Sequence, residues 1–166
     1  DVHDFWSAYF YLHFYTVNTA KLSENVWKEA EKMLEQIQKY PQKEEYQKLV
    51  EADRINLYER EAEKGDDRKF LEETDRVFKE NLRGDPAWKL YERKLVYLES
   101  KQPDISGEFE RFLKKYPKVM DAYVEYSIYL CRNNKMTQAQ RVYREGRKQT
   151  GMTSKRAEEL RRKLGL

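Results

Sequence analysis

Apolar residues in this chain recur three and four positions apart with polar residues between them, a spacing typical of amphipathic helices. The clearest example is a segment that ends at Tyr40-Pro41. Its apolar face carries Val26, Ala30, Met33, Leu34 and Ile37. No stretch alternates strictly between apolar and polar residues, as a half-buried strand would. The pattern predicts about nine helices, over residues 5–15, 26–40, 43–64, 70–82, 86–98, 109–116, 122–130, 137–150 and 154–164, and therefore an all-α fold.

Proline, glycine and short polar residues mark where these helices begin and end. Pro41 and Pro117 each follow a helix that they stop, and Gly65–Asp67 breaks the chain between two helices. Asp85 before Pro86 predicts a helix N-cap, because proline is accepted at the first helical position. The remaining predicted boundaries are the turn Asn133–Lys135, the capping box Thr137–Gln140, the end at Gly151 and a cap at Thr153 or Ser154.

Short motifs recur along the chain with a nearly constant spacing. Leu-Tyr-Glu-Arg occurs at Leu57–Arg60 and again, 33 residues later, at Leu90–Arg93. Aromatic pairs three residues apart also recur, at Trp6 and Tyr9, Trp88 and Tyr91, and Tyr123 and Tyr126. A period of roughly 33–40 residues without strands is typical of stacked helix pairs. These recurring rings are therefore expected between helices, in the core.

The repeat predicts a single helical-repeat domain over residues 1–166, a right-handed α-solenoid of stacked antiparallel helix pairs. Its approximate units cover residues 1–42, 43–86, 87–118 and 119–151, and a capping helix covers residues 153–166. The sequence opens with Asp1, Val2 and His3, without a start methionine or an apolar signal segment. It is therefore expected to be a piece of a longer protein.

Two segments carry a motif that points to a family. The first helix of one unit has an aromatic residue, a tyrosine three positions later and then an acid, in Trp88, Tyr91 and Glu92. The second helix of another unit has alanine, an aromatic residue and basic residues, over Ala139–Arg147. These motifs resemble the half-a-TPR (HAT) variety of the tetratricopeptide superfamily, with a divergent tetratricopeptide repeat as the alternative. The resemblance covers nearly the whole chain.

The resemblance implies a function as well as a fold. HAT repeats are found mostly in RNA-processing assemblies, such as those of splicing, 3′-end cleavage and ribosome biogenesis, where they scaffold other proteins and often dimerise. It therefore implies an intracellular protein, nuclear rather than cytoplasmic. The partners it implies are other protein subunits, a second copy of the chain, or RNA.

Composition excludes several classes of protein. Charged residues make up 38% of the 166 residues, so no stretch is apolar enough to cross a membrane. Aromatic residues reach 14%, which argues against disorder. The single cysteine, Cys131, excludes a disulfide framework and a multi-cysteine zinc site, and suits a reducing compartment. No membrane partner is expected.

The sequence offers few groups for catalysis. His3 and His13 are ten residues apart in one predicted helix, too far to share a metal, and are expected as surface or packing residues. Cys131 follows an apolar run and is expected to pack like a small apolar side chain rather than act as a nucleophile. Gly65–Asp67 is expected to break and cap helices rather than hold a metal. We therefore predict no catalytic residue, metal, cofactor or small-molecule substrate.

Positive charge is concentrated over residues 135–166, which contain ten Lys and Arg against three Glu although the net charge of the chain is only +3. A stripe that begins at Arg141 follows an i, i+3, i+7 spacing, and a second basic group ends the last helix, where it complements the helix dipole. A protein partner or RNA phosphates are the predicted ligands. Tyr143, the aromatic residue beside the stripe, is assigned to the core by its spacing, which disfavours base stacking. The predicted contact residues are Arg141, Arg144, Arg147, Lys148, Arg161 and Arg162.

The first predicted helix is aromatic or apolar on nearly every side, over Phe5–Tyr15. A helix of this kind must be covered on all of its faces. Either a preceding repeat of a longer chain or a partner subunit, including a second copy of this chain, would cover it. The predicted assembly surface consists of Phe5, Trp6, Tyr9, Phe10 and Phe14.

The expected function is a non-enzymatic scaffold for protein–protein interaction in a multiprotein complex, and the resemblance implies RNA processing as its setting. One alternative is a helical repeat that binds single-stranded RNA directly. Another is an auxiliary or regulatory subunit of an enzyme complex.

Overall fold

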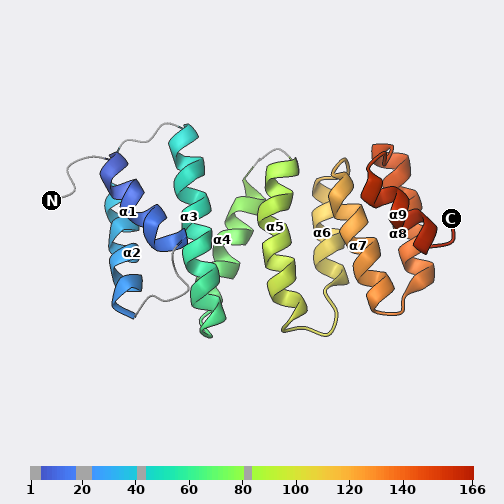
Figure 1. Ribbon diagram of the computed structural model, residues 1–166, viewed down its shortest axis with the longest axis horizontal. Helices are drawn as coiled ribbons and strands as arrows, with labels where there is room; N and C mark the ends of the chain where they lie inside the picture. Colours follow the sequence, from blue (N-terminus) through green and yellow to red (C-terminus); the bar gives the residue numbers. More distant parts are fainter. Residues whose placement is uncertain (1–4, 18–23, 41–43, 81–83) are drawn as a thin grey trace. The chain divides into compact units, whose positions relative to one another are not determined.

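A computed structural model describes residues 5–17, 24–40, 44–80 and 84–166 of the chain. Over these residues the protein consists of α-helices and their connecting turns, and no strand is present among them (Figure 1). The all-α prediction is therefore confirmed for this part of the chain. Its nine helices are α1 (Phe5–Val17), α2 (Glu24–Ile37), α3 (Glu44–Glu63), α4 (Arg68–Lys79), α5 (Gly84–Glu99), α6 (Ser106–Lys115), α7 (Met120–Arg132), α8 (Met136–Thr150) and α9 (Lys155–Lys163).

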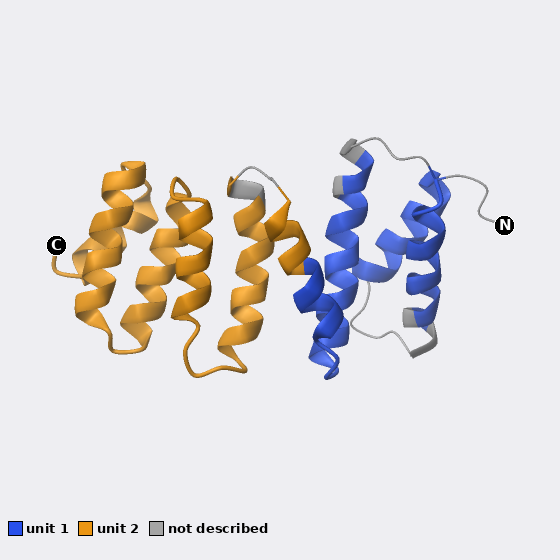
Figure 2. Cartoon of the chain, turned by 180° about the vertical axis from the view of Figure 1, so that it is seen from behind, with its two compact units in different colours: residues 1–73 blue, residues 74–166 orange. Residues whose placement is uncertain are grey.

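The helices gather into two compact units, within residues 1–73 (unit 1) and residues 74–166 (unit 2), so that the division falls inside α4 (Figure 2). In unit 1, α1 contacts both α2 and α3. In unit 2, α7 contacts α6, α8 and α9, and α5 contacts α6. The stacking of helix pairs into a right-handed solenoid, and the boundaries of the repeat units, stay predictions.

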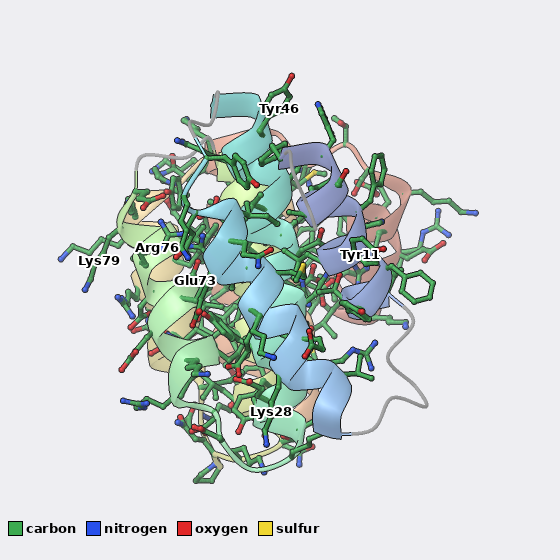
Figure 3. The ribbon with its side chains drawn as sticks, turned by 90° about the vertical axis from the view of Figure 1, so that its left-hand side faces the viewer. Tyr11, Lys28, Tyr46, Glu73, Arg76 and Lys79 are labelled. Atoms are coloured by element: carbon green, nitrogen blue, oxygen red, sulfur yellow. The ribbon has the colours of Figure 1, made fainter. Side chains whose placement is uncertain are left out.

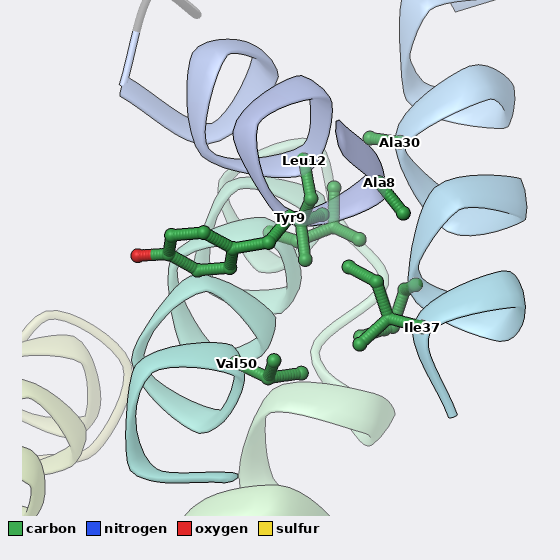
Figure 4. Close-up of a cluster of buried hydrophobic side chains, with 8 residues drawn as sticks. Ala8, Tyr9, Leu12, Ala30, Ile37 and Val50 are labelled. Carbon is green, nitrogen blue, oxygen red and sulfur yellow. The ribbon is translucent and has the colours of Figure 1, made fainter. Parts of the chain in front are cut away.

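The core of unit 1 forms where α1, α2 and α3 meet, as Figure 4 shows. Ala8 and Leu12 of α1 are fully buried there, together with Ala30 and Ile37 of α2 and Val50 of α3. Two of the contributors from α1 and α2 are alanines, which let the helix backbones approach closely. The predicted buried face of the helix before Tyr40 and the long helix predicted over residues 43–64 are both present.

The core of unit 2 is built from aromatic rings. Trp88 of α5 packs edge-on against Phe112 of α6, with the ring centroids 5.0 Å apart, and Tyr91 lies 5.1 Å from the same ring. Phe109 stacks on Tyr126 of α7 at 4.8 Å. These are the offset and edge-to-face arrangements that aromatic quadrupoles favour. The rings predicted for the core from the repeat are therefore buried in this unit.

The turns around α8 follow the residues that mark them in the sequence. Asn134 adopts a left-handed conformation with φ of 58°, as does Gly151 after α8 with φ of 82°. The Ser154 side chain accepts a hydrogen bond from the Ala157 backbone N–H, 3.2 Å away, which caps α9.

Two of the predicted helix N-caps are wrong. The helix α8 begins at Met136, its N-cap is Lys135, and no side chain caps it, so Thr137–Gln140 is not a capping box. The left-handed turn allows the Lys135 N–H to bond the carbonyl of Leu130, and the chain enters the next helix directly afterwards. The helix α5 begins at Gly84, so Asp85 lies in its first turn rather than before it.

Gly146 of α8 lies close against Tyr123 of α7. A Cβ atom at this position would lie 2.6 Å from both Cβ and Cγ of Tyr123 and closer still to Cε of Met152. We expect Gly146→Ala to lower the free energy of unfolding of unit 2 by about 1–3 kcal/mol, because overpacking outweighs the helix propensity of alanine. The measurement is chemical unfolding followed by circular dichroism.

The matched control is Gly107→Ala on α6, where an added Cβ meets no atom within 4 Å. Alanine there is expected to leave stability unchanged or raise it by up to about 1 kcal/mol. Equal destabilisation by the two variants would contradict the close approach at Gly146.

Candidate functional site

Aromatic side chains form a row along the solvent-facing side of α1. Trp6, Phe10 and Phe14 are spaced four residues apart and are 42%, 63% and 57% exposed. Tyr11, which Figure 3 shows on α1, and Val17 are exposed beside them. We call these five residues the α1 aromatic face. No Asp, Glu, Lys or Arg occurs in α1, so the face is apolar along its whole length.

The structure divides the predicted assembly surface between core and solvent. Tyr9 lies in the core cluster of unit 1, and Phe5 packs against that cluster partly buried. Only Trp6, Phe10 and Phe14 of the predicted set are exposed. The assignment of Trp6 to the core is wrong, because α2 and α3 cover the side of α1 that carries Ala8 and Leu12. The Trp6 ring meets the edge of Tyr46 on α3 at 4.9 Å but remains 42% exposed.

A buried carboxylate, that of Asp53, lies between α1 and α3. The Asp53 side chain accepts a hydrogen bond of 2.8 Å from the Thr16 hydroxyl, and Nδ1 of His13 lies 3.1 Å from each of its carboxylate oxygens. Burial, followed by the charge of Asp53, raises the pKa of Tyr9 nearby. The Asp53 carboxylate thus has its hydrogen-bond partners within unit 1. It also connects α3 to His13, whose side chain is about half exposed.

The predicted basic residues separate into two groups. Arg161 donates to Glu158 at 2.9 Å and to the backbone carbonyl of Leu166 at 2.6 Å. Its hydrogen bond, with the charges of Arg147 and Arg162 close by, lowers the pKa of Glu158. These three cations therefore share an acidic neighbour.

Arg141, Arg144 and Lys148 form the other group and follow one face of α8. All three are exposed, and none forms an ion pair with another residue in the described part of the chain. This basic stripe is available to a ligand.

A groove of about 460 Å³ lies beside this stripe, between α6 and α8. Its apolar lining comes from Leu113 of α6 and Val142 of α8, together with Tyr123 and Tyr126 of α7. Its charged lining residues are Glu110, Lys114, Arg141 and Glu145. This groove could not be identified from the sequence, because its residues lie on three helices.

The cysteine lies partly buried on α7. Burial raises the pKa of the Cys131 thiol, although the charge of Lys163 opposes this. The thiol is therefore protonated near neutral pH, and a thiol is a much weaker nucleophile than a thiolate.

Comparisons with known proteins leave the family open. No family model matches the chain, and no curated protein or solved structure gives a significant match. Over the described ranges, no group of three or more His, Cys, Asp or Glu residues is arranged to hold a metal ion. None of the helices found there is long and apolar enough to span a membrane.

Proposed function

We propose that this protein is a non-enzymatic scaffold that binds other proteins in a multiprotein complex. The observation that carries the proposal is the α1 aromatic face, Trp6, Phe10, Tyr11, Phe14 and Val17, exposed on a helix without charged residues. Aromatic residues are enriched, and charged ones depleted, at the centre of protein interfaces. Trp and Tyr are also among the residues whose truncation costs interfaces most affinity.

The size of the face supports a protein partner. An aromatic side chain buries about 150–250 Å² in full, so four rings that are each about half exposed leave roughly 400 Å² to be covered. Apolar patches of about 300–600 Å² are the largest on typical monomers and are often functional. A standard interface buries about 800 Å² on each partner, so this single helix face supplies about half of the area that one partner contributes.

The chemistry of the described cysteine supports a role without catalysis. The Cys131 thiol is protonated, and a thiol is a much weaker nucleophile than a thiolate. Because the residues at Trp88 and Tyr91 resemble a HAT repeat, we propose an RNA-processing assembly in the nucleus as the setting. An auxiliary subunit of an enzyme complex would use the same α1 face.

A second candidate function, direct binding of single-stranded RNA, is favoured by the unpaired stripe Arg141, Arg144 and Lys148. Phosphate contacts of this kind give affinity that falls steeply with salt. Fluorescence anisotropy with a labelled oligouridylate tests it. Tight binding at physiological salt that is lost when Arg141, Arg144 and Lys148 are reversed to Glu would replace the scaffold proposal.

The scaffold proposal is tested by replacing Trp6, Phe10 and Phe14 together with serine in the full protein. We expect the proteins that co-purify with the wild type from its source cells to be lost from the variant, while its helical circular dichroism is kept. The matched control is Val96→Ser, since Val96 is 66% exposed on α5 and lies outside the α1 aromatic face. An unchanged set of co-purifying proteins would contradict the proposal.

A further inference from the structure

The groove between α6 and α8 is lined by apolar and charged side chains. The helix α6 contributes Glu110, Leu113 and Lys114, and the helix α8 contributes Arg141, Val142 and Glu145. Tyr123 and Tyr126 of α7 complete the lining, and each is only 5% exposed. A ligand that enters would therefore meet aliphatic side chains together with charges of both signs.

The two acids of the lining already accept hydrogen bonds from the protein. The Tyr126 hydroxyl donates to Oε1 of Glu110 at 3.1 Å, and Nε2 of Gln149 donates to Oε1 of Glu145 at 2.6 Å. Burial, followed by the bond to Glu110, raises the pKa of Tyr126 to about 12, so its hydroxyl stays a donor at neutral pH.

The two cations of the lining are not engaged in this way. Neither Lys114 nor Arg141 forms a hydrogen bond or ion pair with any residue of the described ranges. The ammonium of Lys114 on α6 and the guanidinium of Arg141 on α8 are therefore free to bind a ligand. Arginine is suited to bidentate contact with a carboxylate.

The lining favours a peptide over a nucleic acid. Single-stranded RNA is bound by stacking its bases on exposed aromatic faces, and the two tyrosines of the lining are almost fully buried. The carboxylates of Glu110 and Glu145 keep free lone pairs that accept backbone N–H groups, which a peptide has and a nucleic acid backbone lacks.

We propose that the α6–α8 groove binds an acidic peptide segment of a partner protein, with one apolar side chain between Leu113 and Val142 and carboxylates on Lys114 and Arg141. Arg144 and Lys148 continue from Arg141 along the same face of α8 and meet further acids of the segment. The inference goes beyond the α1 aromatic face, and rests on the proposed function only in taking a protein as the partner.

The test uses fluorescein-labelled peptides of alternating Glu and Gly with one central Leu, Phe or Trp, titrated by anisotropy into the full chain. We expect at least one of them to bind, and Lys114→Glu and Arg141→Glu each to weaken it by about tenfold or more. Serine in place of the central apolar residue should weaken binding by a similar factor. Amide chemical shifts should change on α6 and α8.

The matched control is Lys155→Glu, which reverses an exposed lysine of α9 outside the groove and should leave affinity unchanged. Absence of binding by every peptide, equal weakening by Lys155→Glu, or equal binding of the serine peptide would overturn the inference. So would an oligouridylate that competes with the peptide and depends on the same two cations.

Serine substitutions of Trp6, Phe10 and Phe14 separate the two proposals. Peptide binding that persists in that variant shows that the groove acts independently of the α1 aromatic face. Loss of co-purifying proteins with intact peptide binding would support both proposals. Failure of the peptide titration alone would overturn only the groove.

Discussion

Replacing Trp88 with alanine is expected to lower the free energy of unfolding of unit 2 by about 3–5 kcal/mol. The indole is 3% exposed and joins α5 to α6 through its contacts with Phe112 at 5.0 Å and Phe109 at 6.4 Å. Its removal leaves a cavity among rings that cannot collapse into it without losing their own contacts. The measurement is urea unfolding followed by circular dichroism.

The matched control is the same substitution at Trp6, which is 42% exposed on α1. We expect a loss below about 1 kcal/mol there, because removing a ring that already faces solvent leaves no enclosed cavity. Similar losses in the two variants would show that the distinction between buried Trp88 and exposed Trp6 is wrong.

The second large effect is expected at Lys94, whose side chain is only 5% exposed. Its Nζ atom lies 2.9 Å from Oδ1 of Asp75 on α4 and 2.9 Å from Oε2 of Glu108 on α6. The Tyr91 hydroxyl donates to the same Glu108 oxygen at 2.5 Å, and Nη1 of Arg111 lies 3.1 Å from Asp75. The Lys94 ammonium on α5 thus connects a carboxylate on α4 with a carboxylate on α6.

We expect Lys94→Met to cost about 3–5 kcal/mol near neutral pH, because it leaves two carboxylates in a partly buried network short of a cation. Methionine keeps the length of the aliphatic stem, so the loss reports the charge rather than the volume. The measurement is again chemical unfolding. A loss below about 1 kcal/mol would mean that Arg111 and Tyr91 satisfy the carboxylates without Lys94.

The pH dependence of this loss gives an independent check. Burial alone would raise the pKa of Asp75 and of Glu108. The pKa of Asp75 is nevertheless held below its ordinary 3.8, first by Lys94, and the pKa of Glu108 below its ordinary 4.5, first by the Tyr91 hydrogen bond and then by Lys94. Carboxyl groups whose pKa is lowered in the folded state stabilise it above the unfolded pKa, and this contribution is lost as pH falls through the folded pKa. The cost of Lys94→Met should therefore be largest near neutral pH and shrink below about pH 4. A cost independent of pH would contradict the charge network.

Helical periodicity is sufficient to predict the nine helices and most of the core, because one face of each helix must be buried whatever lies against it. Gly151 and Asn134 are predictable for a local reason, since few residues adopt positive φ. Trp6 shows the limit of the same pattern. Its spacing matches that of Trp88, but whether a ring is covered depends on which helices lie beside it.

Polar residues in the core escape sequence analysis for a related reason. Asp53 and Lys94 interrupt apolar faces, and their partners are distant in sequence, with His13 40 residues from Asp53 and Asp75 19 residues from Lys94. The pairing exists only once the helices are packed. The groove beside Arg141 has the same origin, because three separate helices line it.

The measurement that tests the scaffold proposal most directly is site-specific photo-crosslinking in the cell. A benzophenone amino acid replaces Phe10, at the centre of the α1 aromatic face, and in a parallel experiment replaces Val96 on α5, which is equally exposed. The scaffold proposal predicts a discrete crosslink from position 10 to a second protein molecule and none from position 96. A crosslink from position 10 only to another part of the same chain, or to RNA, would contradict it.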